Sequence, residues 1–125
     1  MKITSFLYDT TYMPSAPVIT IQVRDRKEVR LTALVDSGAD ATMIPINILR
    51  SIGAHRVDTM QMRGITGVAQ PVGLYSVMIQ ISSHMLPSIH VIATARDSEV
   101  ILGRDVLNHL IITLNGLAGV TEIEI

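Results

Sequence analysis

Short runs of apolar and β-branched residues, separated by polar or glycine-containing turns, recur along most of this chain of 125 residues. Alternation of apolar and polar positions over a few residues is typical of strands with one buried face. The pattern predicts strands at residues 2–8, 18–23, 28–35, 41–44, 57–62, 72–81, 86–93, 99–102, 112–114 and 120–125. Pro87 lies within one of these runs, and because proline cannot donate to a sheet ladder, we expect that strand at a sheet edge.

Two further segments carry helix signals. Residues 45–52 form the first, with Pro45 in its first turn and Gly53 just beyond its end, as helix termini favour. Residues 105–111 form the second. Asn115-Gly116 follows, and because Asn-Gly is a strong signal for a two-residue hairpin turn, we expect the last two strands to pair there. The sequence therefore predicts an all-β fold with one or two short helices.

The composition indicates one small domain with an aliphatic core. Hydrophobic residues make up 48% of the chain and aromatic residues only 3%, so Val, Ile, Leu and Met must fill the interior. We expect a single domain over residues 1–125. Its parts would be an N-terminal strand and linker at 1–16, a core at 17–116 containing a long hairpin at about 57–81, and a C-terminal strand at 117–125.

Charge and cysteine content exclude several classes of function. The formal net charge is −1, without a block of like charge, so we expect no nucleic acid and no membrane as partner. The chain has no cysteine, which removes disulfides, thiol nucleophiles and thiolate metal sites. Its four histidines lack metal-ligand spacing, so we expect no metal and no cofactor. Neither a signal peptide nor an apolar run of about 18 residues is present, which predicts a soluble, cytoplasmic protein.

The strongest candidate for chemistry is Leu34-Val35-Asp36-Ser37-Gly38-Ala39-Asp40, where a predicted strand ends in a carboxylate, a hydroxyl and a glycine. A carboxylate at a tight turn with apolar walls behind it is in a position to be chemically useful. Taken alone, the tripeptide also fits an ordinary polar turn. Asp36 and Asp40 could start a metal or phosphotransfer site, but no further oxygen ligands follow at a recognisable spacing. Ser37 lacks the Gly-x-Ser-x-Gly context of a serine nucleophile.

Two further stretches strengthen the candidate. Val100-Ile101-Leu102-Gly103-Arg104-Asp105-Val106-Leu107 is again an apolar run ending in glycine, and Met62-Arg63-Gly64-Ile65-Thr66-Gly67 lies between it and Asp36. In this order the three stretches resemble the retropepsins, the retroviral-type aspartic proteases and their cellular relatives. The resemblance covers roughly residues 17–116 and implies a retropepsin-like acid protease fold, closed as a homodimer, with the hairpin at about 57–81 as its flap.

The resemblance also implies a reaction. Peptide hydrolysis needs a base for the water and an acid for the carbonyl oxygen, and two neighbouring aspartates that share one proton supply both. This chain has a single Asp-Ser-Gly, so a complete site would need Asp36 and its symmetry mate in a homodimer. The implied activity is that of an aspartic endopeptidase acting on a peptide or protein substrate, without a metal.

Further roles follow from the resemblance residue by residue. Ser37, Gly38 and Ala39 would support the catalytic loop. Asp40 would accept a backbone N–H of the substrate, and Arg104 would pair with it. The remaining substrate-binding positions implied are Leu34, Ala41, Met43, Gly64, Ile65, Val100 and Ile101.

The sequence leaves a second function class open, a catalytically weak or inactive retropepsin-like module for dimerisation or peptide binding. Fold alone does not guarantee turnover. The intact Asp-Ser-Gly-Ala at residues 36–39 favours the enzyme, because a module without catalysis has no need of that carboxylate.

Overall fold

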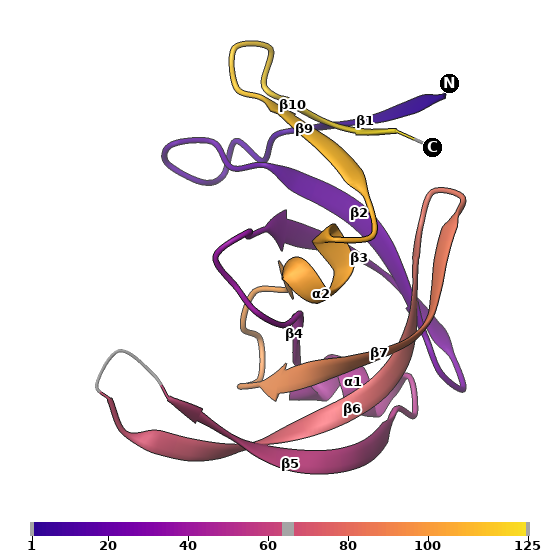
Figure 1. Cartoon of the computed structure of the whole chain (residues 1–125), viewed down its shortest axis with the longest axis vertical. Helices are drawn as coiled ribbons and strands as arrows, with labels where there is room; N and C mark the ends of the chain where they lie inside the picture. Colours follow the sequence, from indigo (N-terminus) through magenta and orange to yellow (C-terminus); the bar gives the residue numbers. More distant parts are fainter. Residues whose placement is uncertain (1, 64–66, 125) are drawn as a thin grey trace.

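Figure 1 shows the computed structural model of the chain, which describes residues 2–63 and 67–124. The prediction of a mostly β chain with one or two short helices is confirmed. None of the helices in this described part is long and apolar enough to cross a membrane. The elements are β1 (Ile3–Leu7), β2 (Val18–Arg24), β3 (Glu28–Val35), β4 (Met43–Pro45), α1 (Ile46–Ser51), β5 (His55–Arg63), β6 (Ala69–Ile81), β7 (His84–Thr94), β8 (Ile101–Leu102), α2 (Arg104–Leu107), β9 (Ile111–Asn115) and β10 (Val120–Glu124).

The strands form two sheets. The larger has the order β2-β3-β8-β4-β7-β6-β5, and it curls because β2 also pairs with β6. The smaller, called here the terminal sheet, has the order β1-β10-β9. In Figure 1 the terminal sheet and the β5–β6 hairpin lie at opposite ends of the molecule, and the loop between β3 and β4 lies between them.

The core is aliphatic, as the composition predicted. On β2 the fully buried Ile19, Ile21 and Val23 alternate with more exposed residues, because successive side chains of a strand point to opposite faces. The other members of the buried cluster come from both sheets and both helices: Ala33, Ile44, Leu49, Ile52, Val77, Ile79, Ile81, Val91, Val100, Leu102, Val106 and Ile123. The core thus lies directly beneath the loop that carries Asp36.

The predicted helix at residues 105–111 is wrong at its C-terminal end. Helix α2 stops at Leu107, and residue 111 already belongs to β9. The amides of His109 and Leu110 donate to carbonyls three residues back, at Val106 and Leu107, and these tighter turns end the helix. Two β-branched isoleucines follow and continue as a strand.

The predicted two-residue turn at Asn115-Gly116 is also wrong. Asn115 pairs with Val120, so residues 116–119 connect β9 to β10. The side-chain oxygen of Asn115 accepts the amide of Ala118 at 3.0 Å, and Gly119 has a φ of +66°, which favours glycine. The hairpin itself forms as predicted.

The expectation that Pro87 marks an edge strand is wrong as well, because β7 lies between β4 and β6. Strand β4 pairs only with the last three residues of β7, at 92–94. On the other side, the pairing of β7 with β6 shifts register between Val77 and Ile79, whose partners are Ile89 and Leu86. Pro87 falls within this irregularity, where a missing N–H is tolerated.

Candidate active site

Strand β3 leads into Asp36 and is paired with a neighbouring strand on each side. Its end pairs with β2 through Leu34 and Val18, and runs parallel to β8 with Val35 beside Leu102. The amide of Val35 donates to the carbonyl of Pro17 at 3.0 Å, and the amide of Asp36 donates to the carbonyl of Leu102 at 3.1 Å. The backbone that carries the carboxylate is therefore fixed by the sheet.

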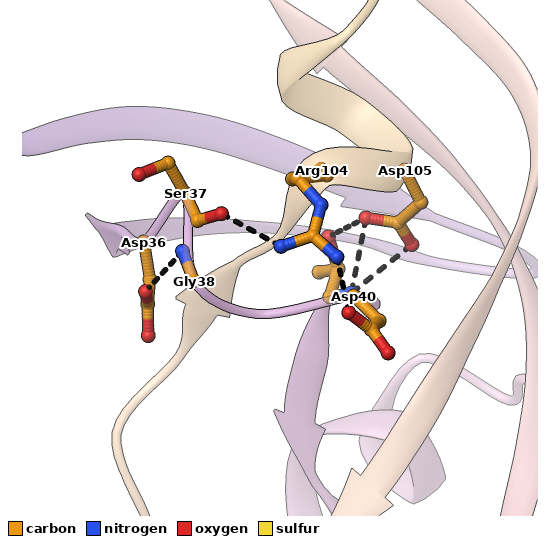
Figure 2. Close-up of polar contacts among 7 residues, drawn as sticks. Asp36, Ser37, Gly38, Asp40, Arg104 and Asp105 are labelled. Atoms are coloured by element: carbon orange, nitrogen blue, oxygen red, sulfur yellow. Dashed lines mark hydrogen bonds and ion pairs between the residues drawn. The ribbon is translucent and has the colours of Figure 1, made fainter.

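The turn after β3 orients the Asp36 side chain. One carboxylate oxygen of Asp36 accepts the amide of Gly38 at 2.9 Å (Figure 2). The carbonyl of Asp36 accepts the amide of Ala39 at 3.2 Å. A Cβ atom at Gly38 would lie only 3.1 Å from that carboxylate oxygen, so a side chain there would press on it. Asp36 is half-buried, while Ser37 and Gly38 are exposed. The carboxylate is thus both oriented and accessible.

Arg104, the first residue of α2, braces the loop. Its Nη1 donates to the carbonyl of Ser37 at 2.8 Å, and its Nη2 forms an ion pair with Asp40 (Figure 2). The amide of Arg104 also donates to the carbonyl of Ala39 at 2.9 Å. The Asp40 side chain is 90% exposed and that of Arg104 45%, so water screens the ion pair. Such exposed pairs contribute up to about 1 kcal/mol, and the contact to Ser37 adds a second anchor.

A second brace was not assigned from the sequence. Thr42 is fully buried, and both carboxylate oxygens of Asp105 accept its amide at 3.0 Å. The Thr42 hydroxyl donates to Asp105 at 2.8 Å and accepts the amide of Gly103 at 3.1 Å. The available signal was an acidic residue in the first turn of a helix, but its partner lies 63 residues away.

Gly103 lets α2 approach the loop backbone to backbone. A Cβ atom there would lie 2.6 Å from the carbonyl carbon of Ala41 and 2.7 Å from its oxygen. The φ of Gly103 is −93°, so the requirement for glycine comes from this close approach and not from backbone strain.

A cavity of about 450 Å³ lies between this loop and β5. Of the predicted substrate-binding residues, Asp40, Ala41 and Met43 line it, together with Gly38 and Ala39. Its other lining residues were not predicted from the sequence as substrate-binding positions: Met60, Gln61, Met62, Arg63 and Ile92. Met60 and Met62 could have been found, because residues two apart share one face of a strand.

The remaining predicted positions lie elsewhere. Leu34, Val100 and Ile101 belong to the β3–β8 contact beneath the loop, where the amide of Leu34 donates to the carbonyl of Val100 at 2.9 Å. They do not line the 450 Å³ cavity. Gly64 and Ile65 lie outside the described residues. Within the described ranges, no three His, Asp or Glu side chains are grouped so that they could hold a metal ion.

Comparisons with known proteins bear on the fold and the family. A family described as "gag-polyprotein putative aspartyl protease" matches residues 19–109, well over half of the chain. A search of curated protein sequences gives no match.

Among solved structures, a retropepsin-like aspartic protease from Rickettsia conorii is similar, with a TM-score of 0.62 at 12% identity, covering 98% of this chain and 91% of that chain. EIAV protease, solved in complex with the inhibitor HBY-793, has a TM-score of 0.54 at 25% identity, covering 75% of this chain and 86% of that chain. The predicted retropepsin-like fold is therefore confirmed, and the chain belongs to the retropepsin-like aspartyl protease family.

Proposed function

We propose that the protein is a homodimeric aspartic endopeptidase, in which Asp36 and its symmetry mate activate a water between them. The observation that supports this most directly is the Asp36 turn, an accessible carboxylate on a backbone held by two strands and braced by α2. The family match supports the reaction class. Each chain supplies one such turn, so a working pair of carboxylates requires two chains.

The proposed reaction needs one proton shared by the two carboxylates, because two neighbouring charges disfavour full ionisation. The ionised carboxylate takes a proton from water, and the resulting hydroxide attacks the peptide carbonyl carbon. The protonated carboxylate gives its proton to the carbonyl oxygen at the same time. When the tetrahedral intermediate collapses, the C–N bond breaks, and the carboxyl group that took the proton from water gives it to the leaving nitrogen. The other carboxylate takes a proton from a hydroxyl of the intermediate, which becomes the new carboxylic acid, so the dyad again holds one shared proton.

The cavity beside the loop supports a peptide substrate. Its floor and walls are mainly apolar, with Met43, Met60, Met62 and Ile92 available to contact a substrate side chain. The exposed carboxylate of Asp40 stands at its edge, where it could accept a backbone N–H of an extended peptide. In this proposal Ser37, Gly38 and Ala39 support the loop, and Arg104 holds Asp40.

The remaining assignments belong to the assembled dimer. There Leu34, Val100 and Ile101 would face the substrate around the shared dyad, and Gly64 and Ile65 would close over it at the flap tip. A closed flap excludes water from the reacting groups, which strengthens their electrostatic interactions.

The test is Asp36→Asn, assayed by digestion of a peptide library at several pH values. The substitution keeps the shape of the side chain and removes its acid–base function, so we expect hydrolysis to disappear and the circular dichroism spectrum to persist. Asp97→Asn is the matched control, because Asp97 is an exposed aspartate remote in sequence from this turn. Turnover retained by Asp36→Asn would refute the proposal. A dimeric wild type that binds peptides but cleaves none at any pH would favour the inactive module instead.

A further inference from the structure

Folding brings two basic segments of the chain together. The first is the turn between β2 and β3, at residues 24–28, and the second runs from the end of α1 into β5, at residues 50–56. The amides of Arg26 and Lys27 both donate to the carbonyl of Ile52 at 3.1 Å, and the two segments lie side by side in Figure 1. Hydrogen bonds between backbone groups therefore hold the two segments next to each other.

These segments concentrate positive charge in a chain that is otherwise acidic. They hold five of the ten lysines and arginines, but only two of the eleven aspartates and glutamates. All five cationic residues are exposed, and they are called here the basic cluster: Arg24, Arg26, Lys27, Arg50 and Arg56. The sequence shows no continuous block of like charge, because the cluster forms only where the two segments meet.

A cavity of about 440 Å³ opens at Arg24, on one side of the basic cluster. Its donors are Arg24, His55 and Ser76, whose guanidinium, imidazole and hydroxyl groups all suit a carboxylate. Arg24 pairs with Glu28 at 3.3 Å, but the two side chains are 51% and 41% exposed, so a ligand carboxylate can replace Glu28 at little cost. The other lining residues are Asp25, Val77, Met78 and Pro87. The cavity thus offers an acidic side chain a defined place beside the cluster.

We propose that the basic cluster and this cavity form a docking site for an acidic segment of the protein substrate. The inference rests on the proposed function and adds a substrate class to it, namely proteins with clustered aspartate or glutamate residues near the cleavage site. Charge complementarity selects this partner, because a group of exposed cations attracts and orients a segment of opposite charge.

An acidic peptide fits this surface better than a nucleic acid does. The carboxylates of Asp25 and Glu28 lie among the cations, paired with His55 and Arg24. These carboxylates would repel a continuous phosphate backbone, whereas a peptide segment has backbone N–H groups that can donate to them. The mixture of charges therefore favours a polypeptide partner.

Strand β5 sets the distance between the docking site and the candidate active site. It begins at His55, beside the basic cluster, and its residues 60–63 line the cavity next to the Asp36 turn. Arg56 and Met62 are six residues apart, which corresponds to about 20 Å along a strand. An extended peptide of about six residues covers the same distance, so we expect the acidic segment about six to ten residues from the scissile bond.

Binding of a labelled peptide tests the docking site independently of hydrolysis. The probe is fluorescein-labelled hexaglutamate, measured by fluorescence anisotropy at low salt, with hexaglutamine as the control probe. Lys27→Glu/Arg50→Glu reverses one charge on each segment, and we expect the dissociation constant of hexaglutamate to rise by about tenfold or more. Added salt should weaken the binding to wild type, because it screens exposed charges.

Lys2→Glu/Arg96→Glu is the matched control. It changes the net charge by the same amount at two exposed cations outside the basic cluster, so hexaglutamate should bind it much as it binds wild type. Circular dichroism of each variant checks the fold. Lys27→Gln/Arg50→Gln removes the two charges without reversing them, and it replaces the glutamate variant if that variant does not fold.

A second measurement asks whether the docking site serves the reaction. Two peptide libraries share one randomised segment, and one carries a hexaglutamate tail where the other carries hexaglutamine. At low substrate concentration, wild type should cleave the acidic library about tenfold faster, through a lower KM and not a higher kcat. Lys27→Glu/Arg50→Glu should bring the ratio of the two rates toward one, and Lys2→Glu/Arg96→Glu should keep it.

The outcomes separate this inference from the proposed function. Hexaglutamate that does not bind, or that binds Lys27→Glu/Arg50→Glu as well as wild type, would overturn the docking site and leave the enzyme proposal standing. So would an oligothymidylate of equal charge that binds where hexaglutamate does not. Binding without any preference between the libraries would overturn the link to the substrate. Binding that depends on Lys27 and Arg50, in a protein that hydrolyses neither library, would uphold the docking site and contradict the enzyme.

Discussion

At the scale of single residues, Asp105 and Arg104 brace the same loop by different physical means. Asp105 accepts hydrogen bonds from the amide and hydroxyl of the fully buried Thr42. Arg104 donates to Ser37 and pairs with a carboxylate that is open to water. A buried donor that loses its acceptor is costly, whereas an exposed ion pair that breaks is replaced by water. Asp105 should therefore contribute more than Arg104 to the free energy of unfolding.

We predict that Asp105→Ala lowers the free energy of unfolding more than Arg104→Ala does. The first change leaves the Thr42 amide buried without its acceptor, at a cost of about 1–3 kcal/mol. The loss of the Arg104–Asp40 ion pair should cost less than about 1 kcal/mol. Urea melts of both variants measure the difference. Asp105→Asn keeps one acceptor oxygen and should recover part of the loss. The opposite ranking would mean that the Arg104 contacts dominate the brace.

The residue types at the candidate site were predictable in part. Asp36 and Gly38 were marked by a strand that runs into a turn, and Arg104 by its place after an apolar run and a glycine. The link between Asp105 and Thr42 was not predictable, because it joins residues 63 positions apart through a buried hydroxyl. Local patterns carry no information about which distant amide a carboxylate will meet.

At the scale of elements, the contact between α2 and the loop that carries Asp36 depends on the absence of a side chain at Gly103. We predict that Gly103→Ala destabilises the protein by about 1–3 kcal/mol, the usual range for overpacking, and impairs hydrolysis. The new Cβ would lie 2.6 Å from a backbone carbon of Ala41, and the backbone has little freedom to move. Gly116→Ala is the matched control, because nothing lies within 4 Å of its Cβ position. Thermal melts and the peptide assay compare the two, and equal effects would contradict the close packing.

A second contact between elements fastens the base of the β5–β6 hairpin. Asp25, in the turn between β2 and β3, accepts the Nδ1 of His55 at 2.9 Å and its amide at 3.1 Å. The hydrogen bond from the His55 side chain lowers the pKa of Asp25 below its usual value. A carboxylate with a lowered pKa stabilises the folded state above about pH 4, and this stabilisation is lost as the pH falls through the lowered value.

We therefore predict that Asp25→Asn is less stable than wild type near neutral pH and that the gap narrows in acid. Urea melts from about pH 6 down to about pH 2 would follow the closing of this gap. His55→Ala removes the same side-chain hydrogen bond from the other partner, so it should remove the same acid-sensitive part of the stability. A gap that stays constant over this range would show that the Asp25 charge plays no part.

Elements with a clear period of two were predicted well, and those set by long-range contacts were not. The bounds of β3 at residues 28–35 follow from its alternation, and β2 differs from its prediction by one residue. The predictions for the end of α2 and for the β9–β10 turn were wrong. Hydrogen bonds to carbonyls three residues back end the helix, and a hydrogen bond to the Asn115 side chain shapes the turn. The prediction of an edge strand from Pro87 was wrong because Pro87 lies at an irregularity in the β6–β7 pairing, where a missing N–H is tolerated within the sheet.

At the scale of the whole molecule, most of the exposed large apolar side chains of the described residues belong to two parts of the fold, while Met13, Met85 and Leu117 lie outside them. Ile3, Leu7, Ile111 and Leu114 belong to the terminal sheet. Val57 and Met60 lie on β5, and Val68 just before β6. In the proposed enzyme, substrate would cover part of the second region, because Met60 lines the cavity beside the loop that carries Asp36.

The final prediction concerns the sharing of one site by two chains. Wild type and Asp36→Asn are unfolded together, refolded and left to pair at random. If each site needs Asp36 from both chains, only wild-type homodimers are active, so activity follows the square of the wild-type fraction. At equal mixing about a quarter of the dimers should be active, against half of the chains if each worked alone. Specific activity of pure wild type should also fall on dilution below the dimer dissociation constant. A linear mixing curve with activity independent of dilution would mean that one chain suffices, and Asp36 would then need a different acid–base partner within its own chain.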